Sequence, residues 1–425
     1  MAQSRFRISS TSRILIGLAA GALCGLLAAR VDPALAGAAA DFAQPIGRLW
    51  LNALQMTVVP LVFALVTVGV SAANDAAASG RTARRALVVF AALLSAGALF
   101  VAIAAPFLLS LLPRDPVLIE KLRAAMPAST VAAAHPGFGD WIATVVPANA
   151  IAAAAQSAML PLVVFALFFG FALTRVEQPR RAHMIELLQT LADTMIVIVR
   201  WVLWAAPLGV FALVFGVCAR AGSGVLSALG WYIALQCSMY IAVTLLLYPT
   251  VVIVGRERLS RFAPAIFAPQ VVAASTQSSL ASLPAMIESA RGRLEYPTSI
   301  VALVLPMAVS LFRITSPMQY LGVATFVAWI YGIDVGAAQL AVAAALAVVL
   351  SLGAVGLPGQ VSFMAATMPV TAAMGLPIEP LGLLLAVDTI PDVFATVGNV
   401  SADLVATAIV ARGASPDAAG APATG

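Results

Sequence analysis

Four polar side chains lie in an apolar segment near the end of the chain. The segment Leu383–Arg412 is apolar enough to cross a bilayer, yet it contains Asp388, Asp392, Asn399 and Asp403. At about 100° per helical residue, these four fall within about 60° of one another, on one narrow stripe. Each carboxylate in mid-membrane costs about 2.5–3.5 kcal/mol. We therefore interpret the stripe as one wall of a solute and cation site; a water-filled crevice or a helix held by structural polar contacts is the alternative.

The composition indicates a polytopic membrane protein. Of 425 residues, 62% are hydrophobic and 10% are charged, whereas soluble domains are about half apolar and a quarter charged. The net charge is +5, but the basic residues lie in short loops between apolar segments, which is a topology signal. The cysteines and histidines show no metal-ligand spacing. We expect membrane lipid around the chain, no nucleic-acid partner and no cofactor besides a coupling ion.

Six membrane spans are expected before residue 262. The first follows a basic start that is similar to a signal peptide, but the spans after it favour an uncleaved helix. The fourth is expected in pieces because of Pro147 and Pro161, and the fifth is expected to kink at Pro207 and Gly209. The six are Ile14–Ala29, Leu49–Val70, Ala86–Leu112, Trp141–Thr174, Ile196–Ala219 and Leu229–Val254.

Arginines predict the orientation of the chain. They gather in the N-terminus and in alternate loops, which the positive-inside rule places in the cytoplasm. Both termini are therefore expected on the cytoplasmic side of the cell inner membrane. The arginines are Arg5, Arg7, Arg13, Arg81, Arg84, Arg85, Arg175, Arg180, Arg181, Arg256, Arg258 and Arg261.

Two later segments predict hairpins that enter and leave the membrane on one side. Ala265–Met286 has a Ser/Thr-rich centre, and Ala337–Pro377 has apolar arms around the Gly/Pro-rich stretch Gly353–Gln360. Between them lies a seventh span, Ser299–Ile330, with a break expected at Phe312–Pro317. Non-helical backbone at membrane depth is tolerated only where it lines protein or a cavity. The expected fold is all-α, with eight transmembrane helices and two re-entrant helical hairpins. Paired broken segments of this kind point to a transporter site at the midplane.

The order of these motifs resembles the dicarboxylate/amino acid:cation symporter family, which includes excitatory glutamate transporters and archaeal aspartate transporters. Each motif is weak alone, but together they cover most of the chain. They are QMTVVPLVFALVTVGV (Gln55–Val70), VVPANAIAAAAQSAMLPLVVFALFFG (Val145–Gly170), APLGVFAL (Ala206–Leu213), STQSSLASLP (Ser275–Pro284) and GLPGQ (Gly356–Gln360).

This resemblance implies a homotrimer that works as an elevator. Residues 1–75 would supply scaffold spans one and two, and residues 114–222 scaffold spans four and five. A mobile transport domain would comprise span three (76–113) and residues 223–413, with span six, both hairpins, span seven and span eight. Residues 414–425 are expected to form a disordered tail.

The resemblance also implies roles for individual residues. Asp392 matches the carboxylate that receives a substrate amino group, and Asn399 an asparagine near the substrate carboxylate and a cation. Asp403 matches a sodium-ligating aspartate, so sodium is expected at Asn399 and Asp403. Asp388 matches an acidic residue buried nearby. The hairpin tips contribute Ser278 and Ser279, which match positions holding the substrate carboxylate, and the gate residues Leu357, Pro358 and Gly359.

Three departures from the family pattern change the expected chemistry. Ala395 lies where acidic-amino-acid carriers place an arginine, at about −20° on the stripe, so no guanidinium is available there. Gln277 replaces an arginine of the first hairpin. The Asn-Met-Asp-Gly-Thr motif of span seven is absent: its place is taken by Phe312, Arg313, Ile314, Thr315 and Ser316, and Ser316 would replace its threonine.

Arg313 is a permanently charged side chain that requires anionic partners in a membrane. Our hypothesis is that it supplies charge that a sodium ion supplies in relatives, facing Asp388, Asp392 and Asp403. The alternatives are a structural Arg–Asp pair with unchanged coupling, and a contact to a substrate carboxylate. Arg200, within the fifth span, is expected to have a structural or interfacial role.

We therefore expect a secondary active symporter of a small amino-acid-like solute, coupled to Na⁺ or H⁺. Asp392 favours a substrate with an ammonium group, and Ala395 favours a neutral side chain. A C4-dicarboxylate or acidic amino acid carrier with altered or proton coupling is the alternative. A passive channel, a transport-inactive binding protein and an intramembrane enzyme are rivals. An enzyme is disfavoured because no span offers a histidine beside the serines.

Overall fold

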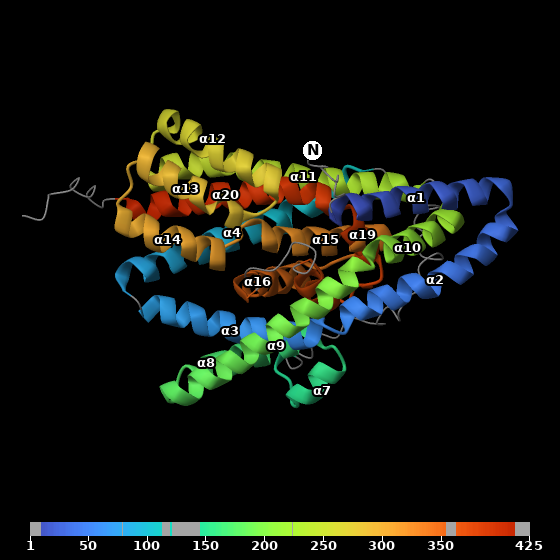
Figure 1. Cartoon of the computed structure of the whole chain (residues 1–425), viewed down its shortest axis with the longest axis horizontal. Coiled ribbons are helices and arrows are strands. Elements are labelled where there is room, and N and C mark those ends of the chain that lie inside the picture. Colours follow the sequence, from blue (N-terminus) through green and yellow to red (C-terminus); the bar gives the residue numbers. More distant parts are fainter. Residues whose placement is uncertain are drawn as a thin grey trace, which may run out of the picture.

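The computed structural model describes residues 10–78, 80–112, 120, 145–222, 224–353 and 363–412, and these residues form helices with no strand among them (Figure 1). The predicted all-α class is therefore confirmed over the described residues. The first half contains α1 (Ser10–Val31), α2 (Pro33–Gln55), α3 (Val58–Ala78), α4 (Arg81–Ser110), α7 (Ala150–Ala155), α8 (Met159–Leu173), α9 (Gln178–Trp204) and α10 (Ala206–Ala221).

The second half has longer helices and broken ones. Three short segments, labelled η, are π-helical. The elements are α11 (Gly224–Thr250), η1 (Val251–Gly255), α12 (Leu259–Thr276), α13 (Ser279–Glu288), η2 (Ser289–Arg293), α14 (Thr298–Leu311), α15 (Thr315–Tyr331), α16 (Ala337–Gly353), η3 (Phe363–Thr367), α18 (Met368–Ala373), α19 (Pro380–Val387) and α20 (Thr389–Ala411).

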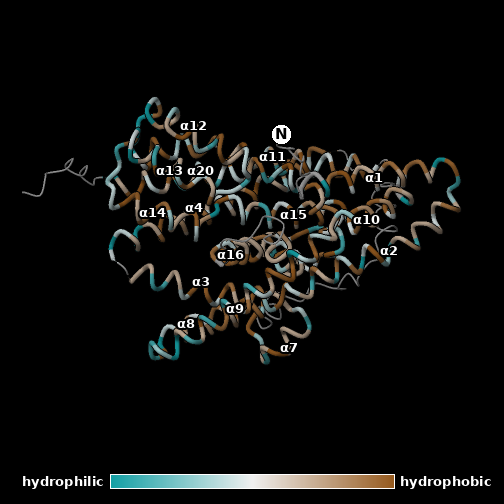
Figure 2. The backbone as a smooth tube through the Cα atoms, in the orientation of Figure 1, coloured by the Kyte–Doolittle hydropathy of each residue, from teal (hydrophilic) through white to brown (hydrophobic). Residues whose placement is uncertain are grey.

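The helices are apolar over lengths that match a bilayer. Within the described residues, seven helical stretches are long and apolar enough to cross a membrane. Figure 2 shows hydrophobic colours along most of the helical backbone, with hydrophilic stretches at helix ends. α20 differs from the other stretches because 83% of its most apolar window is buried inside the protein. The polar stripe of this helix therefore faces protein.

The predicted second span is wrong in its bounds. The structure has two helices, α2 and α3, which together extend well beyond Leu49–Val70 and are separated at Met56 and Thr57. Pro60 has no N–H to bond the carbonyl of Met56, four residues earlier, so the helical ladder is interrupted here. The sequence did not reveal this break because apolar residues continue on both sides of it.

The predicted fifth span is also wrong in its bounds. α9 begins at Gln178, far before Ile196. The interruption expected at Pro207 and Gly209 is present and falls at Ala205, just ahead of Pro207. The indole N–H of Trp50 in α2 donates to the carbonyl of Val202 at 3.1 Å, close to this break. A Cβ atom on Gly209 would lie 2.3 Å from the Trp50 ring, so only glycine fits there.

The close contact between α1 and α10 requires glycine residues in α1. A Cβ atom on Gly17 would lie 2.4 Å from the carbonyl oxygen of Pro207, and one on Gly21 would lie 2.7 Å from that of Phe211. Small residues at this spacing let two helix backbones approach closely in a membrane. α1, α2 and α10 pack together on this basis at one end of the molecule (Figure 1).

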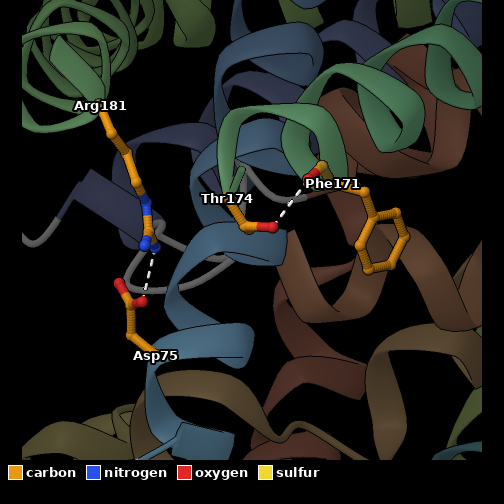
Figure 3. Close-up of polar contacts among 4 residues, drawn as sticks. All are labelled: Asp75, Phe171, Thr174 and Arg181. Carbon is orange, nitrogen blue, oxygen red and sulfur yellow. Dashed lines mark hydrogen bonds and ion pairs between the residues drawn. The ribbon is translucent and has the colours of Figure 1, made fainter. Parts of the chain in front are cut away.

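The predicted fourth span is confirmed as a helix in pieces over its described part. α7 and α8 are separated at residues 156–158, where Ser157 has a φ of 54°. After α8, the hydroxyl of Thr174 donates to the carbonyl of Phe171, and Arg181 of α9 pairs with Asp75 of α3 at 2.5 Å (Figure 3). This ion pair joins α3 to α9 at the surface.

α20 lies in the middle of a second group of helices. It packs against α4, α11, α12, α13, α14 and α15. The seventh span is broken between α14 and α15, where Phe312 is extended, as its Phe312–Pro317 motif predicted. Phe312 stacks on Phe90 of α4 with ring centroids 4.9 Å apart, which fills the gap beside the break with apolar side chains.

Candidate functional site

The polar stripe of the last helix lies almost entirely inside the protein. Asp403 is 0% exposed, Asn399 1% and Asp388 5%, whereas Asp392 is half-buried. Asp388 occupies the junction between α19 and α20 rather than the interior of one helix. Pro391 explains the junction, because it has no N–H to bond the carbonyl of Val387. Three predicted site residues are therefore buried, and the fourth borders them.

Asn399 joins α20 to the break in the seventh span. Its side-chain oxygen accepts hydrogen bonds from the backbone N–H and the hydroxyl of Thr315, at 3.0 and 2.9 Å. The same hydroxyl lies 3.3 Å from the carbonyl oxygen of Ala395. Ala395 and Ser316 are both buried, and the N–H of Ser316 donates to the carbonyl of Arg313. The break is thus held against the face of α20 that carries the stripe.

Asp403 and Asn399 present polar atoms without partners among the described residues. Both carboxylate oxygens of Asp403 and the side-chain nitrogen of Asn399 are buried and accept or donate no hydrogen bond there. Buried polar groups are almost always paired with protein, water or an ion. Carboxylate and amide oxygens are hard ligands that suit a small cation. Asp403 therefore has the chemistry to hold one, whereas the Asn399 amide oxygen is already used by Thr315.

Arg313 lies near the same carboxylates without touching them. Its charge acts on both Asp392 and Asp403. Within the described residues, no Arg313 nitrogen comes within 4.0 Å of a carboxylate oxygen, and its buried Nε atom has no hydrogen-bond partner. The guanidinium therefore compensates charge at a distance and keeps free donors.

The first hairpin reaches the beginning of α20. Gln277 has left-handed backbone angles (φ 53°, ψ 33°), which end α12 and reverse the chain. Its side-chain nitrogen donates to the carbonyl of Thr389 at 3.2 Å. Ser278 caps α13 by accepting from the N–H of Ala281 at 3.2 Å, and Ser279 is half-buried beside it. The Ser-rich tip thus lies next to the stripe.

Other predicted residues lie outside this arrangement. The gate residues Leu357, Pro358 and Gly359 are outside the described residues, as is the tail 414–425. Arg200 is exposed on α9 and so is separate from the buried stripe.

A buried cluster around Asp388 was missed by the sequence analysis. The hydroxyl of Tyr232 donates to one Asp388 oxygen at 2.7 Å, and the side-chain nitrogen of Gln319 donates to the other at 2.7 Å. Gln236 lies beside them and is 0% exposed. The only available signal was the presence of these polar residues within apolar segments. Nothing in the pattern joined α11 and α15 to the junction at Asp388.

The comparisons with known proteins agree with this architecture. The family model described as "Sodium:dicarboxylate symporter family" matches residues 11–413. The chain is 27% identical to the "Proton/glutamate-aspartate symporter" of Escherichia coli (strain K12), over 87% of this chain and 84% of the relative. It is 26% identical to the "Proton/sodium-glutamate symport protein" of Geobacillus stearothermophilus, over 96% and 94%.

A third relative carries a different solute in its name. The chain is 28% identical to the "C4-dicarboxylate transport protein 2" of Ralstonia nicotianae (strain ATCC BAA-1114 / GMI1000), over 96% of this chain and 90% of the relative. These relatives are transport proteins and not enzymes, and the predicted resemblance is confirmed. The chain is a multi-pass membrane protein that belongs to the sodium:dicarboxylate symporter family.

Proposed function

We propose that this symporter carries a small amino-acid-like solute across the cytoplasmic membrane, with a neutral amino acid preferred. The observation that carries the proposal is the pairing of half-buried Asp392 with apolar Ala395 on one face of α20. Asp392 would receive the ammonium group of the solute by a charge-assisted hydrogen bond. Ala395 would leave room for a side chain but offer it no countercharge.

The carboxylate end of the solute would be held at the first hairpin. The tip residues Gln277, Ser278 and Ser279 lie beside α20, and the N-terminus of α13 presents free N–H groups to an anion. The unpaired nitrogen of Asn399 is a further donor. We assign Ser316 to the wall of this site and Leu357, Pro358 and Gly359 to its gate.

A second candidate solute is a C4-dicarboxylate or an acidic amino acid. Arg313 supports it, because its Nε atom is unpaired among the described residues and its charge reaches the region of Asp392. Relatives whose names include glutamate, aspartate and C4-dicarboxylates favour it as well. In this case Arg313 would bind the distal carboxylate that Ala395 cannot bind.

We further propose that Arg313 replaces one coupling cation. The resemblance implies a sodium ion at Asp403 and Asn399; because the Asn399 oxygen already accepts two hydrogen bonds from Thr315, Asp403 would be its main ligand. The fixed charge of Arg313 would compensate Asp392 in place of a second ion. The effect of its charge on both Asp392 and Asp403 supports the assignment. The carrier would then use fewer cations than a relative without this arginine, with Na⁺ or H⁺ as the coupling ion.

The proposed architecture follows the same resemblance. Eight spans and two re-entrant hairpins would divide into scaffold segments 1–75 and 114–222 and a transport domain of 76–113 and 223–413, which moves as an elevator within a homotrimer. Packing of α1 and α2 with α10, and of α20 with α4, α11 and α15, supports this division. The carrier would lie in the cell inner membrane, with its N- and C-termini on the cytoplasmic side.

Reconstituted uptake tests the proposal. Purified protein in liposomes would be given labelled alanine, serine, aspartate and succinate under separate Na⁺ and H⁺ gradients. Accumulation of alanine or serine above the outside concentration, lost in Asp392→Asn, supports the neutral-amino-acid proposal. Accumulation of succinate or aspartate alone supports the second candidate. Equilibration without accumulation would indicate a passive channel, and binding without uptake a transport-inactive protein.

A further inference from the structure

Asp388 is a buried carboxylate that is held by two neutral side chains. Asp388 is 5% exposed and lies where α19 and α20 meet, packed against α11. The charge of Arg313 acts on Asp392 and Asp403, and among the described residues no basic nitrogen lies within 4.0 Å of an Asp388 oxygen. The two groups that hold the Asp388 carboxylate, Tyr232 and Gln319, are both neutral donors.

The side-chain oxygen of Gln236, close to Asp388, is a hydrogen-bond acceptor that no described residue uses. Gln236 lies four residues after Tyr232 on α11, so the two side chains are neighbours on one face of this helix. The side-chain nitrogen of Gln236 donates to the carbonyl of Gln319 at 3.4 Å, while its oxygen has no partner among the described residues. A Cβ atom on residue 322 would lie 2.6 Å from that oxygen, so Gly322 provides the space for this amide.

We propose that Asp388 is the proton-binding residue of this carrier and that Tyr232 and Gln236 form a hydrogen-bond switch that accommodates both of its forms. This inference rests on the proposed function and names its coupling ion. In the ionised form, Tyr232 and Gln319 donate to the two carboxylate oxygens. On protonation, the new O–H of Asp388 donates to the Tyr232 oxygen, and the Tyr232 hydrogen turns to the Gln236 oxygen.

The proton has one suitable position on this carboxylate. The oxygen facing Gln319 meets an amide N–H₂, which can donate but cannot accept. The oxygen facing Tyr232 meets a hydroxyl, which can do both. Protonation therefore occurs on the Tyr232 side, and every hydrogen bond broken in the switch is replaced by another.

The charges around the site favour such a proton. The charge of Arg313 acts on Asp392 and Asp403, which leaves Asp388 as a third buried carboxylate, and carrying uncompensated charge through a bilayer is costly. Protonated Asp388 removes one negative charge without an additional metal ion. The solute ammonium group and a cation at Asp403 would compensate the others.

Titratable neighbours come from three of the elements packed around Asp388. α11 contributes Tyr232, Cys237 and Tyr240, α15 contributes Tyr320 near Tyr240, and α20 contributes Asp392, whose charge repels that of Asp388. Of the other elements that contact α19, α1 carries Arg13, Cys24 and Arg30, α10 carries Cys218 and Arg220, and η3 (FMAAT) carries no titratable side chain. Among the described residues, Asp392 is thus the carboxylate whose charge acts on Asp388, and neutralising it with a bound solute would alter proton binding at Asp388.

Proton movement and solute exchange together test this inference. Liposomes would contain a pH-sensitive dye, and the labelled solute would be whichever of alanine, serine, aspartate and succinate the wild type accumulates. Wild type should acidify the lumen as solute enters. Asp388→Asn should lose this acidification and the accumulation driven by a pH gradient, yet still exchange labelled for unlabelled solute at equal pH. Asp334→Asn, in the exposed connection after α15, is the matched control.

Three outcomes would count against the inference. Acidification by Asp388→Asn at the wild-type ratio of protons to solute would overturn it. Accumulation driven by sodium without acidification would overturn it while leaving the proposed symport intact. Absence of both uptake and exchange in wild type would overturn the proposed function as well.

If Asp388→Asn does not fold, a second variant tests the proposed hydrogen-bond switch. Gln236→Leu removes the acceptor that the protonated form needs, so proton binding should require more acidic conditions. The pH of half-maximal proton-coupled uptake should fall by roughly half to one unit. Ser238→Ala, on the same helix but bonded only to the carbonyl of Leu235, should leave it unchanged. An unchanged pH profile in Gln236→Leu would overturn the switch.

Discussion

Thr315 and Asn399 join the break between α14 and α15 to the middle of α20: the N–H and the hydroxyl of Thr315 both donate to the Asn399 side-chain oxygen, at 3.0 and 2.9 Å. One amide oxygen therefore sets the position of the break relative to the buried acids. It also directs the unpaired Asn399 nitrogen away from Thr315, because the two ends of the amide point in different directions.

Removing the Thr315 hydroxyl should destabilise this junction. Thr315→Val keeps the backbone hydrogen bond but places a methyl group against a buried amide oxygen, at a cost of about 1–2 kcal/mol. The thermal midpoint in detergent should fall accordingly. Thr325→Val on the same helix is the control, because the Thr325 hydroxyl bonds only the carbonyl of Leu321, one turn earlier. Equal midpoints for both variants would contradict the structural importance of the Thr315–Asn399 contact.

Neutralising Arg313 should change how transport depends on sodium. Arg313→Met leaves Asp392 and Asp403 without the positive charge that acts on both. We expect uptake to become weaker at low sodium and to recover as sodium rises, since a mobile cation must then replace the fixed one. The measurement is initial uptake against sodium concentration for wild type, Arg313→Met and Arg313→Lys. If wild type already shows a multi-sodium dependence, the replacement hypothesis fails.

Asp392→Asn should affect solutes that carry an ammonium group most strongly. Loss of a charge-assisted hydrogen bond costs about 2–3 kcal/mol, which corresponds to roughly 30- to 150-fold in half-saturating concentration. Competition by amino acids and by matched dicarboxylates against a labelled solute would measure this. The control is Asp75→Asn, which breaks the surface ion pair with Arg181 (Figure 3) and should leave affinity unchanged. Equal losses for amines and dicarboxylates would argue against an ammonium site at Asp392.

Adding one methyl group at Gly21, in the α1–α10 contact, should destabilise the protein. Gly21→Ala places a Cβ atom 2.7 Å from the Phe211 carbonyl oxygen, and backbone cannot yield as a flexible side chain does. Overpacking of this kind costs about 1–3 kcal/mol. Gly37→Ala in α2 is the matched control, because no atom lies within 4 Å of the added Cβ. The midpoint in detergent should fall for Gly21→Ala and hold or rise for Gly37→Ala.

Much of this fold was predictable because the bilayer leaves few choices. Apolar length predicted most helices, and the polar residues of α20 predicted an inward face because acids in lipid are costly. The break at Phe312–Pro317 was predicted from the residue pattern of the seventh span, and the structure has it between α14 and α15. The break at Met56 and Thr57 and the early beginning of α9 at Gln178 were not predicted. The break at Met56 and Thr57 gives no signal because apolar residues continue across it. The first turns of α9 are polar, so apolar length did not predict them as part of the helix.

From the residue pattern alone, the candidate site was predictable along one helix, and the resemblance added the hairpin tip at Gln277, Ser278 and Ser279. Periodicity grouped Asp388, Asn399 and Asp403, but it carries no information on which side chains of other helices approach them. Tyr232 and Gln319 come from 156 and 69 residues away in the sequence to reach Asp388. Such pairings depend on tertiary packing, which a single sequence does not specify.

The hydrogen bond from the Trp50 indole to Val202 connects two interrupted helix pairs and should couple their movements. The indole bonds Val202 beside the interruption between α9 and α10, and it belongs to the last turns of α2, just before the interruption ahead of α3. The pairs α2–α3 and α9–α10 are therefore connected at their interruptions, so a change in the angle of one pair should change the angle of the other. Spin labels on the outer ends of α3 and α10 should therefore report a shared motion in wild type and two unrelated motions once Trp50 is shortened to leucine.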